Sequence, residues 1–192
     1  AMHVLIPGGS GLIGQALTRN LLGDGHSVTI LSRRARSVKM PSQAQVLHWD
    51  GINTSGWELE MERTDVVVHL AGESIAGSGI LPRRWTAEKK ELIRSSRIST
   101  GQILSIAIDS AKQKPAVFIQ ASAVGYYGPI GAQPINESQP PGTDYLSKVC
   151  LDWEASSTAV KALGVRHAVA RFGLPLSMKG GVLPRLTLPI RM

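Results

Sequence analysis

The sequence has a single cysteine, few aromatic residues and no metal-ligand pattern. Only 5% of its 192 residues are aromatic, and Cys150 is the one thiol. One cysteine excludes an intramolecular disulfide and any site built from several thiolates. The histidines are scattered without the spacing of metal ligands, so we predict no metal site. Cys150 falls in an apolar helical stripe, which indicates a buried structural thiol rather than a nucleophile.

Long apolar runs are also missing. No apolar stretch reaches the ~18 residues that a membrane-spanning helix needs. The first residues read as a short strand that runs into glycines, which is unlike a signal peptide. Together with the single cysteine, these absences predict a protein of the reducing cytoplasm without a membrane partner.

Basic residues outnumber acidic ones, but they do not form a dense stripe. The chain has 21 Lys and Arg against 14 Asp and Glu, a formal charge of +7. Local groups occur only at Arg33-Arg34, Arg36 and Arg83-Arg84. A nucleic-acid reader usually concentrates its basic residues and interleaves them with aromatics. The excess charge therefore favours a phosphate-bearing small molecule over nucleic acid.

Short apolar runs alternate with longer helical patterns along the chain. Strands are predicted at 3–6, 28–31, 45–48, 66–70, 116–120 and 165–171. Helices are predicted from about Ile13 to Gly23, from about 86 to 112 and from 146 to 160, with loops at 33–44, 72–84 and 125–144. This alternation predicts an α/β fold with a doubly wound parallel sheet and helices on both faces.

The most informative segment is Gly8-Gly9-Ser10-Gly11-Leu12-Ile13-Gly14, which follows the first strand and opens the first helix. Residues without a Cβ permit a tight turn, close approach of the backbone to a pyrophosphate, and packing of the helix on the sheet. The start of the helix supplies free N–H groups and positive potential. We therefore predict a Rossmann-type dinucleotide site that includes the positions Gly8, Gly11, Leu12, Ile13 and Gly14.

The spacing of Gly8, Gly11 and Gly14 resembles that of the short-chain dehydrogenase/reductase superfamily. The further motifs His69–Glu73, Arg84-Trp85, Ser96-Arg97 and Ser122–Gly128 are similar to an atypical epimerase-family subgroup of its extended, sugar-nucleotide epimerase/dehydratase branch. The resemblance implies an NADP-binding domain at residues 1–175 and, at 176–192, the start of an incomplete substrate-binding segment. It also implies an NADP(H)-dependent oxidoreductase or epimerase that transfers hydride at a carbinol or carbonyl carbon, with a nucleotide-sugar as one possible substrate.

The end of the second strand bears on the choice of cofactor. NAD-binding proteins tend to carry an acidic residue there for the ribose 2′-hydroxyl. This sequence instead has Ser32-Arg33-Arg34, which can donate to a 2′-phosphate that a carboxylate would repel. We therefore predict NADP rather than NAD, and a solvated basic loop is the alternative. The resemblance further implies that Leu70, Ala71 and Gly72 pass beside the adenosine ribose, whereas His69 is expected to be packed and hydrogen-bonded.

The resemblance implies a catalytic Ser or Thr after the fifth strand, a Tyr acid/base and a Lys four residues beyond it. Ser122 matches the first, and Tyr145 and Lys148 are the nearest match to the others, although they are three residues apart. A phenol of pKa ~10 needs a nearby cation to exchange protons near neutrality. Positions i and i+3 of a helix are neighbours, so the pair can cooperate.

Several alternatives stay open from the sequence. The usual tyrosine position can fall on Leu146 instead, and Tyr126 or Tyr127 could approach the same site or simply anchor their glycine-rich loop. Arg83, Arg84 and Trp85 could face a substrate or form a solvated helix start. The off-pattern Tyr/Lys spacing leaves a non-catalytic NADP-binding regulator or redox sensor as a rival function. Some relatives in this subgroup carry a cell-division-inhibitor label, for which the residues supply no physical basis.

Overall fold

A computed structural model describes residues 1–75, 85–181 and 183–186. Six parallel strands form one sheet in the order β3-β2-β1-β4-β5-β6. The strands are β1 His3–Pro7, β2 Ser27–Ser32, β3 Gln45–His48, β4 Val66–His69, β5 Val117–Ala123 and β6 Arg166–Phe172. The direction of winding reverses between β1 and β4, which is the switch point where such sheets bind ligands. The predicted α/β fold is confirmed.

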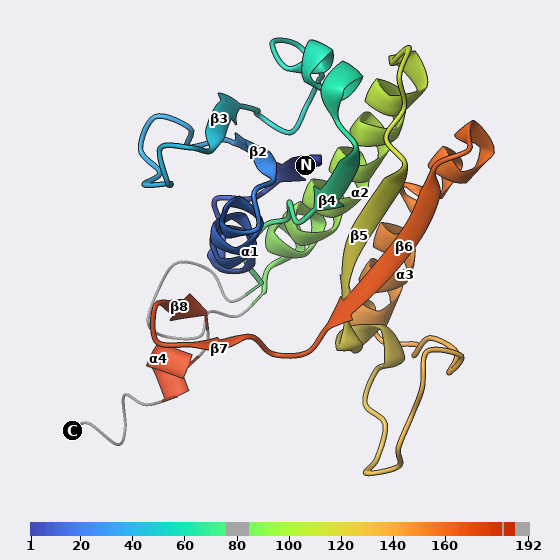
Figure 1. Cartoon of the computed structure of the whole chain (residues 1–192). Coiled ribbons are helices and arrows are strands. Elements are labelled where there is room, and N and C mark those ends of the chain that lie inside the picture. The colour runs from blue at the N-terminus through green and yellow to red at the C-terminus, as the bar shows by residue number, and fades with distance from the viewer. Residues whose placement is uncertain (76–84, 182, 187–192) are drawn as a thin grey trace.

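Helices connect the strands and cover both faces of the sheet (Figure 1). They are α1 Leu12–Gly23, α2 Ala87–Ser110, α3 Tyr145–Ala155 and the short α4 Leu183–Leu186, with 3-10 helices η1 Glu58–Arg63, η2 Val124–Tyr127 and η3 Thr158–Leu163. Side chains cap α2 and α3: Thr86 accepts from the N–H of Lys89 before α2, and Asp144 accepts from that of Ser147 before α3. A small hairpin, β7 Leu176–Ser177 with β8 Gly180–Gly181, lies in the segment after β6.

Strands β1 to β5 divide their apolar side chains between two cores. Val4 and Ile6 of β1 pack with Leu17 of α1 on one face. Leu5, between them in sequence, packs with Ile108 of α2 on the other face. Figure 1 shows the same division, with α1 on one side of the sheet and α2 and α3 on the other. A strand that is buried on both faces is apolar at consecutive positions, which explains the uninterrupted apolar runs of the sequence.

The structure corrects one predicted helix. The sequence pattern predicted a helix from 146 to 160, but α3 ends at Ala155 and Val160 lies in η3. The hydroxyl of Ser156 donates to the carbonyl of Trp153 at 2.6 Å, and such local side-chain bonds compete with the helical ladder. The predicted domain division after residue 175 stays a prediction.

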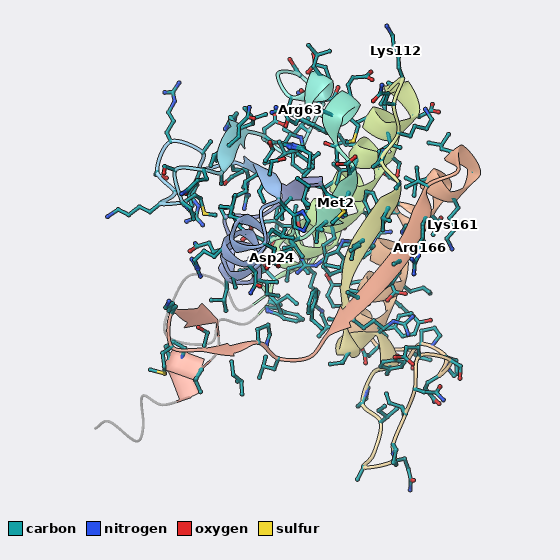
Figure 2. All side chains as sticks on the ribbon, viewed as in Figure 1. Met2, Asp24, Arg63, Lys112, Lys161 and Arg166 are labelled. Atoms are coloured by element: carbon teal, nitrogen blue, oxygen red, sulfur yellow. The ribbon has the colours of Figure 1, made fainter. Side chains whose placement is uncertain are left out.

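The two ends of the sheet carry different connecting segments. Figure 2 places Arg63 and Lys112, from the segments before β4 and β5, at the amino end of the sheet. The opposite, carboxyl end carries the long connection between η2 and α3, which extends away from the sheet in Figure 1. Within the described residues, no helix combines the length and the apolar character that crossing a bilayer requires.

Candidate active site

A cavity of about 560 Å³ opens at the carboxyl end of the sheet, beside the switch point. It is lined from the ends of β1, β2, β3 and β4 and from one face of α2. Its lining contains Ser10 and eight of the predicted cofactor residues, namely Gly8, Gly11, Ser32, Arg33, Arg34, Leu70, Ala71 and Gly72. The predicted cofactor residues therefore converge on one cavity, apart from three that lie at the start of α1.

The glycine loop allows two backbone segments to touch. Gly8 has a φ of 80°, and a Cβ built there would lie 2.6 Å from the backbone nitrogen of Ala71. A Cβ on Gly14 would lie 2.4 Å from the Cα of Gly9. Since real atoms do not approach this closely, any side chain at these two positions would force the β1 loop away from β4 or from α1.

Leu12, Ile13 and Gly14 form the first turn of α1, and their N–H groups have no acceptor within the helix. No side chain caps this helix at Gly11, and its first turn contains no acidic residue. The turn therefore combines free donors with positive potential at the cavity edge, which suits a pyrophosphate. Together with the glycine contacts, this cradle fits a dinucleotide.

The residues that are predicted to bind a 2′-phosphate lie at the end of β2. The hydroxyls of Ser10 and Ser32 are 2.9 Å apart, and the N–H of Arg34 donates to the Ser32 hydroxyl at 3.2 Å. Arg33 instead reaches across the cavity, and its Nη2 donates to Oε2 of Glu73 at 3.2 Å. A phosphate at the end of β2 would therefore compete with Glu73 for Nη2 of Arg33.

Glu73 joins two cationic side chains at the end of β4. Its Oε1 accepts from the Nζ of Lys89 at 3.2 Å, in addition to the contact with Arg33. Burial raises the pKa of the Glu73 carboxyl, but the hydrogen bonds from Lys89 and Arg33 outweigh burial and hold this pKa below its ordinary value. Glu73 therefore stays ionised and keeps the two cations at the cavity rim.

Part of the cavity wall was missed by the sequence analysis. It consists of the segment after β3 and the inward face of α2, namely Trp49, Asp50, Gly51, Ile52, Leu92, Ser95, Ser96, Ser99, Thr100 and Ile103. The position of residues 49–52 at the carboxyl end of a parallel strand was an available signal. The face that α2 presents depends on packing and had no comparable signal.

The side chain of Ser122 lies in a polar cluster and does not line the cavity. It lies near the carboxyl end of β5, and its hydroxyl donates to Oε1 of Glu154 on α3 at 2.6 Å. Arg171 of β6 grips the same carboxylate, with Nε at 2.8 Å from Oε1 and Nη2 at 2.9 Å from Oε2. The hydroxyl proton of Ser122 is thus directed at a carboxylate that is already paired with a guanidinium.

The two loop tyrosines belong to the same cluster. The guanidinium of Arg171 lies 3.6 Å from the ring centroid of Tyr126, and its Nη1 donates to the hydroxyl of Tyr127 at 2.8 Å. The hydrogen bonds with Glu154 and Tyr127 raise the pKa of Arg171 above its already high value. This geometry matches the interpretation of Tyr126 and Tyr127 as anchors of their loop.

Tyr145 and Lys148 point to different surroundings. The hydroxyl of Tyr145 donates to the carbonyl of Lys90 on α2 at 2.5 Å, and its ring packs against Trp85. Burial and the charge of Glu91 raise the pKa of Tyr145, against the smaller opposing effect of Arg97. The side chain of Lys148 is exposed, and it forms no hydrogen bond or ion pair within the described part of the chain. Arg83 and Arg84 lie outside the described residues.

His69 and Cys150 are enclosed, as expected. His69 is 0% exposed, with Nδ1 at 3.1 Å from Oε1 of Gln120 and Nε2 at 3.0 Å from the hydroxyl of Thr100. Burial lowers the pKa of His69 to about 4, so the ring is neutral near pH 7. Burial also raises the pKa of the Cys150 thiol, which makes it a poor nucleophile.

Comparison with known proteins gives this geometry a context. Residues 4–185 match the family described as the NAD dependent epimerase/dehydratase family. The chain belongs to this family. Epimerase family protein YfhF of Bacillus subtilis is 38% identical over 191 residues, which cover 99% of this chain and 60% of that protein. Epimerase family protein SDR39U1 of Bos taurus is 36% identical over 192 residues, covering 100% and 60% respectively.

Solved structures agree with the family assignment. The crystal structure of human epimerase family protein SDR39U1 (isoform 2) with NADPH has a TM-score of 0.79 and 33% identity, covering 99% of this chain and 60% of that one. A UDP-glucuronic acid 4-epimerase from Bacillus cereus shares the fold with a TM-score of 0.71 at 21% identity, covering 88% of this chain and 56% of that one. The chain spans about 60% of the length of these family members.

Proposed function

We propose that the chain forms the NADP(H)-binding part of an oxidoreductase or epimerase that transfers hydride at a carbinol or carbonyl carbon. The observation that carries the proposal is the cavity itself. Backbone donors at the start of α1 adjoin it, and Ser32, Arg33 and Arg34 line it at the end of β2. A nicotinamide cofactor would supply the hydride, while the chain's residues hold its phosphates and adenosine.

The preference for NADP follows from the charges at the end of β2. Two guanidinium groups lie there, and the only carboxylate paired with them in the described part is Glu73, whose contact is with the exposed Arg33. A 2′-phosphate carries more charge than one carboxylate and can take over Arg33 while Ser32 donates a hydrogen bond. The NADPH bound in the human SDR39U1 structure, which is 33% identical, supports the same cofactor here.

Titration of the purified chain with NADPH and NADH tests the cofactor. We expect NADPH to bind more tightly, and Arg33→Ala and Arg34→Ala each to weaken NADPH binding by about tenfold, without changing NADH binding. Arg36→Ala, an exposed basic residue of the same loop, is the matched control and should leave both affinities unchanged. Equal affinity for the two cofactors in the unaltered protein would contradict the NADP assignment.

Ser122, Tyr145 and Lys148 are proposed as the catalytic group. The position of Ser122 near the carboxyl end of β5 supports it, but Tyr145 must first release the carbonyl of Lys90. NADPH turnover on a panel of nucleotide-linked sugars tests this group. Ser122→Ala and Tyr145→Phe are each expected to reduce turnover by about 100-fold. Full turnover by both variants would remove the group from the mechanism.

A second function is favoured by the raised pKa of Tyr145 and by the exposed Lys148. Without a stabilised phenolate, ordinary proton transfer by this tyrosine is slow. The chain would then be a non-catalytic NADP-binding regulator or redox sensor. Stoichiometric NADPH binding without turnover on any of the tested substrates would favour this function over the first. The expected cytoplasmic location stays a prediction.

A further inference from the structure

Arg97 of α2 carries a buried positive charge without an ion-pair partner. The residue is 8% exposed, and it pairs with no carboxylate among the described residues. Its Nη1 donates to the carbonyls of Ile93 at 2.9 Å and Glu73 at 3.0 Å. Two carbonyl dipoles hold the side chain in place but do not neutralise its charge. Buried arginines are normally paired, so this charge requires an explanation.

The other edge of the guanidinium is free. Within the described part of the chain, Nε and Nη2 of Arg97 donate to no acceptor. Both atoms also keep some exposure to solvent. Among the described residues, the side-chain N and O atoms that are fully enclosed and lack a hydrogen-bond partner are Thr18 Oγ1 and Trp153 Nε1, so Nε and Nη2 of Arg97 are not fully enclosed. The edge formed by Nε and Nη2 therefore keeps part of the 8% of Arg97 that remains exposed.

The position of Arg97 connects the cofactor cavity with the cluster around Ser122. A Cβ on Gly72, which lines the cavity, would lie 3.2 Å from the Cζ of Arg97. On α3, the guanidinium lies 4.9 Å from the ring centroid of Trp153, one residue before the carboxylate that binds Ser122. Burial lowers the pKa of His69, and the charge of Arg97 acts in the same direction, as expected for a guanidinium that packs near the end of β4.

We propose that Arg97 binds a carboxylate group of the substrate through its Nε–Nη2 edge. Two parallel N–H donors match the two oxygens of a carboxylate, and the buried site strengthens the charge interaction. A planar carboxylate matches this pair of donors better than a tetrahedral phosphate, and Gly72, which packs against Arg97, lines the cavity. The substrate class is then a carboxylic acid. This proposal rests on the proposed function, because the carboxylate would lie next to the bound cofactor.

Malonate is a suitable probe, with malonamide as its uncharged counterpart and inorganic phosphate as the tetrahedral anion. Binding to the chain is followed by the Nε–Hε NMR signal of Arg97, with and without saturating NADPH. We expect malonate to shift this signal, malonamide to have no effect, and phosphate to bind at least about tenfold more weakly than malonate. The signal is assigned by its absence in Arg97→Lys.

Calorimetry on variants supplies the second measurement. Arg97→Met is expected to weaken malonate binding by more than about tenfold. Arg97→Lys keeps the positive charge but not the two parallel N–H donors, and it is expected to weaken malonate binding by about fivefold. Arg94→Lys is the matched control one turn earlier on α2, because Arg94 is half-exposed and paired with Asp152. It should leave malonate affinity within about twofold of the original.

The outcomes separate the site from the proposed function. Malonate binding that is no tighter than malonamide binding, tighter binding of phosphate, or unchanged malonate affinity in Arg97→Met would each overturn the proposal. A purely structural Arg97 would lower the melting temperature of Arg97→Met without changing malonate affinity. If Arg97→Met does not fold, Arg97→Lys and the NMR signal of the unaltered protein decide. Malonate binding without any NADPH binding would retain the anion site and reject the cofactor assignment.

Discussion

The two halves of the carboxyl end of the sheet are built in different ways. At β1, β2 and β4, the cavity is shaped by backbone: glycines let the main chain pass close, and helix N–H groups supply the donors. At β5 and β6, Ser122, Glu154 and Arg171 meet through side chains from three separate elements. The close backbone contacts of the first half depend on residues that lack a side chain, although Arg33 and Glu73 also pair there, whereas the second half depends on pairing between side chains alone.

This difference explains why sequence motifs describe the two halves unequally. A backbone cradle is encoded in one continuous segment, residues 8–14, whose spacing is visible in the chain. A cluster of side chains joins positions 122, 154 and 171, whose proximity depends on strand register and helix packing. The comparison predicts that Gly8 and Gly14 of the first half tolerate no added side-chain atom, whereas the second half tolerates size changes but not the loss of a charge.

The largest expected effect is that of an added methyl group in the cradle. Gly14→Ala should lower the free energy of unfolding by about 3 kcal/mol, because its Cβ would meet the backbone of Gly9, which cannot move aside. Urea denaturation measures this change. Gly23→Ala at the end of the same helix is the control, since a Cβ there has open space and should cost nothing. Equal effects of the two substitutions would break the comparison.

The cluster of Ser122, Glu154 and Arg171 in the second half should show the next largest effect. Arg171→Met leaves Glu154 mostly buried without its partner and should lower the free energy of unfolding by about 2–3 kcal/mol. Arg94→Met removes a similar but half-exposed pair with Asp152 and should cost less than about 0.5 kcal/mol. Both values come from urea denaturation at pH 7. A small effect of Arg171→Met would mean that the cluster is not held by charge.

Acidification should lower the free energy of unfolding through His69, which lies at the boundary between the two halves. Its pKa is about 4 in the folded chain, below the value near 6.5 expected when unfolded, so the unfolded chain binds more protons between these values. The contribution of His69 to the free energy of unfolding is therefore fully present above about pH 6.5 and is lost as the pH falls toward 4. The expected loss is about 2 kcal/mol between pH 7.5 and 5.

Unfolding curves at several pH values check this expectation. His69→Asn should flatten the pH dependence over this range, whereas His48→Asn, at an exposed position, should leave it unchanged. The lowered pKa of His167, caused by burial and by the charge of Lys161, adds a smaller contribution of the same sign. A profile that His69→Asn does not alter would show that this ring is not the group that resists protonation.

The smallest effect is expected for the hydroxyl of Tyr145. Tyr145→Phe removes one hydrogen bond to the carbonyl of Lys90 and should lower the free energy of unfolding by about 1 kcal/mol. A decrease of that size together with a large loss of turnover would show that the hydroxyl has a catalytic role beyond this contact. The same decrease with full turnover would assign the hydroxyl to the α2–α3 contact alone.

Sequence by itself determined the layered α/β fold, the six strands and the glycine cradle. These features are local: apolar runs mark strands that are buried on both faces, and a glycine is required wherever backbones touch, as Gly8 touches Ala71. The end of α3 was mispredicted because the hydroxyl of Ser156, which donates to the carbonyl of Trp153, competes with the helical bonds after Ala155. A pattern of apolar residues does not reveal this competition.

Only the tertiary structure decided which charges meet. The pairing of Arg33 with Glu73, the bond from Ser122 to Glu154, and the bond from Arg97 to the carbonyl of Glu73 link residues tens of positions apart. A side chain's partner depends on which helix face packs inward and on the strand register, and neither is written in residue spacing. For this reason the cofactor cradle could be predicted from one segment, whereas the surroundings of Ser122 and Arg97 required the folded chain.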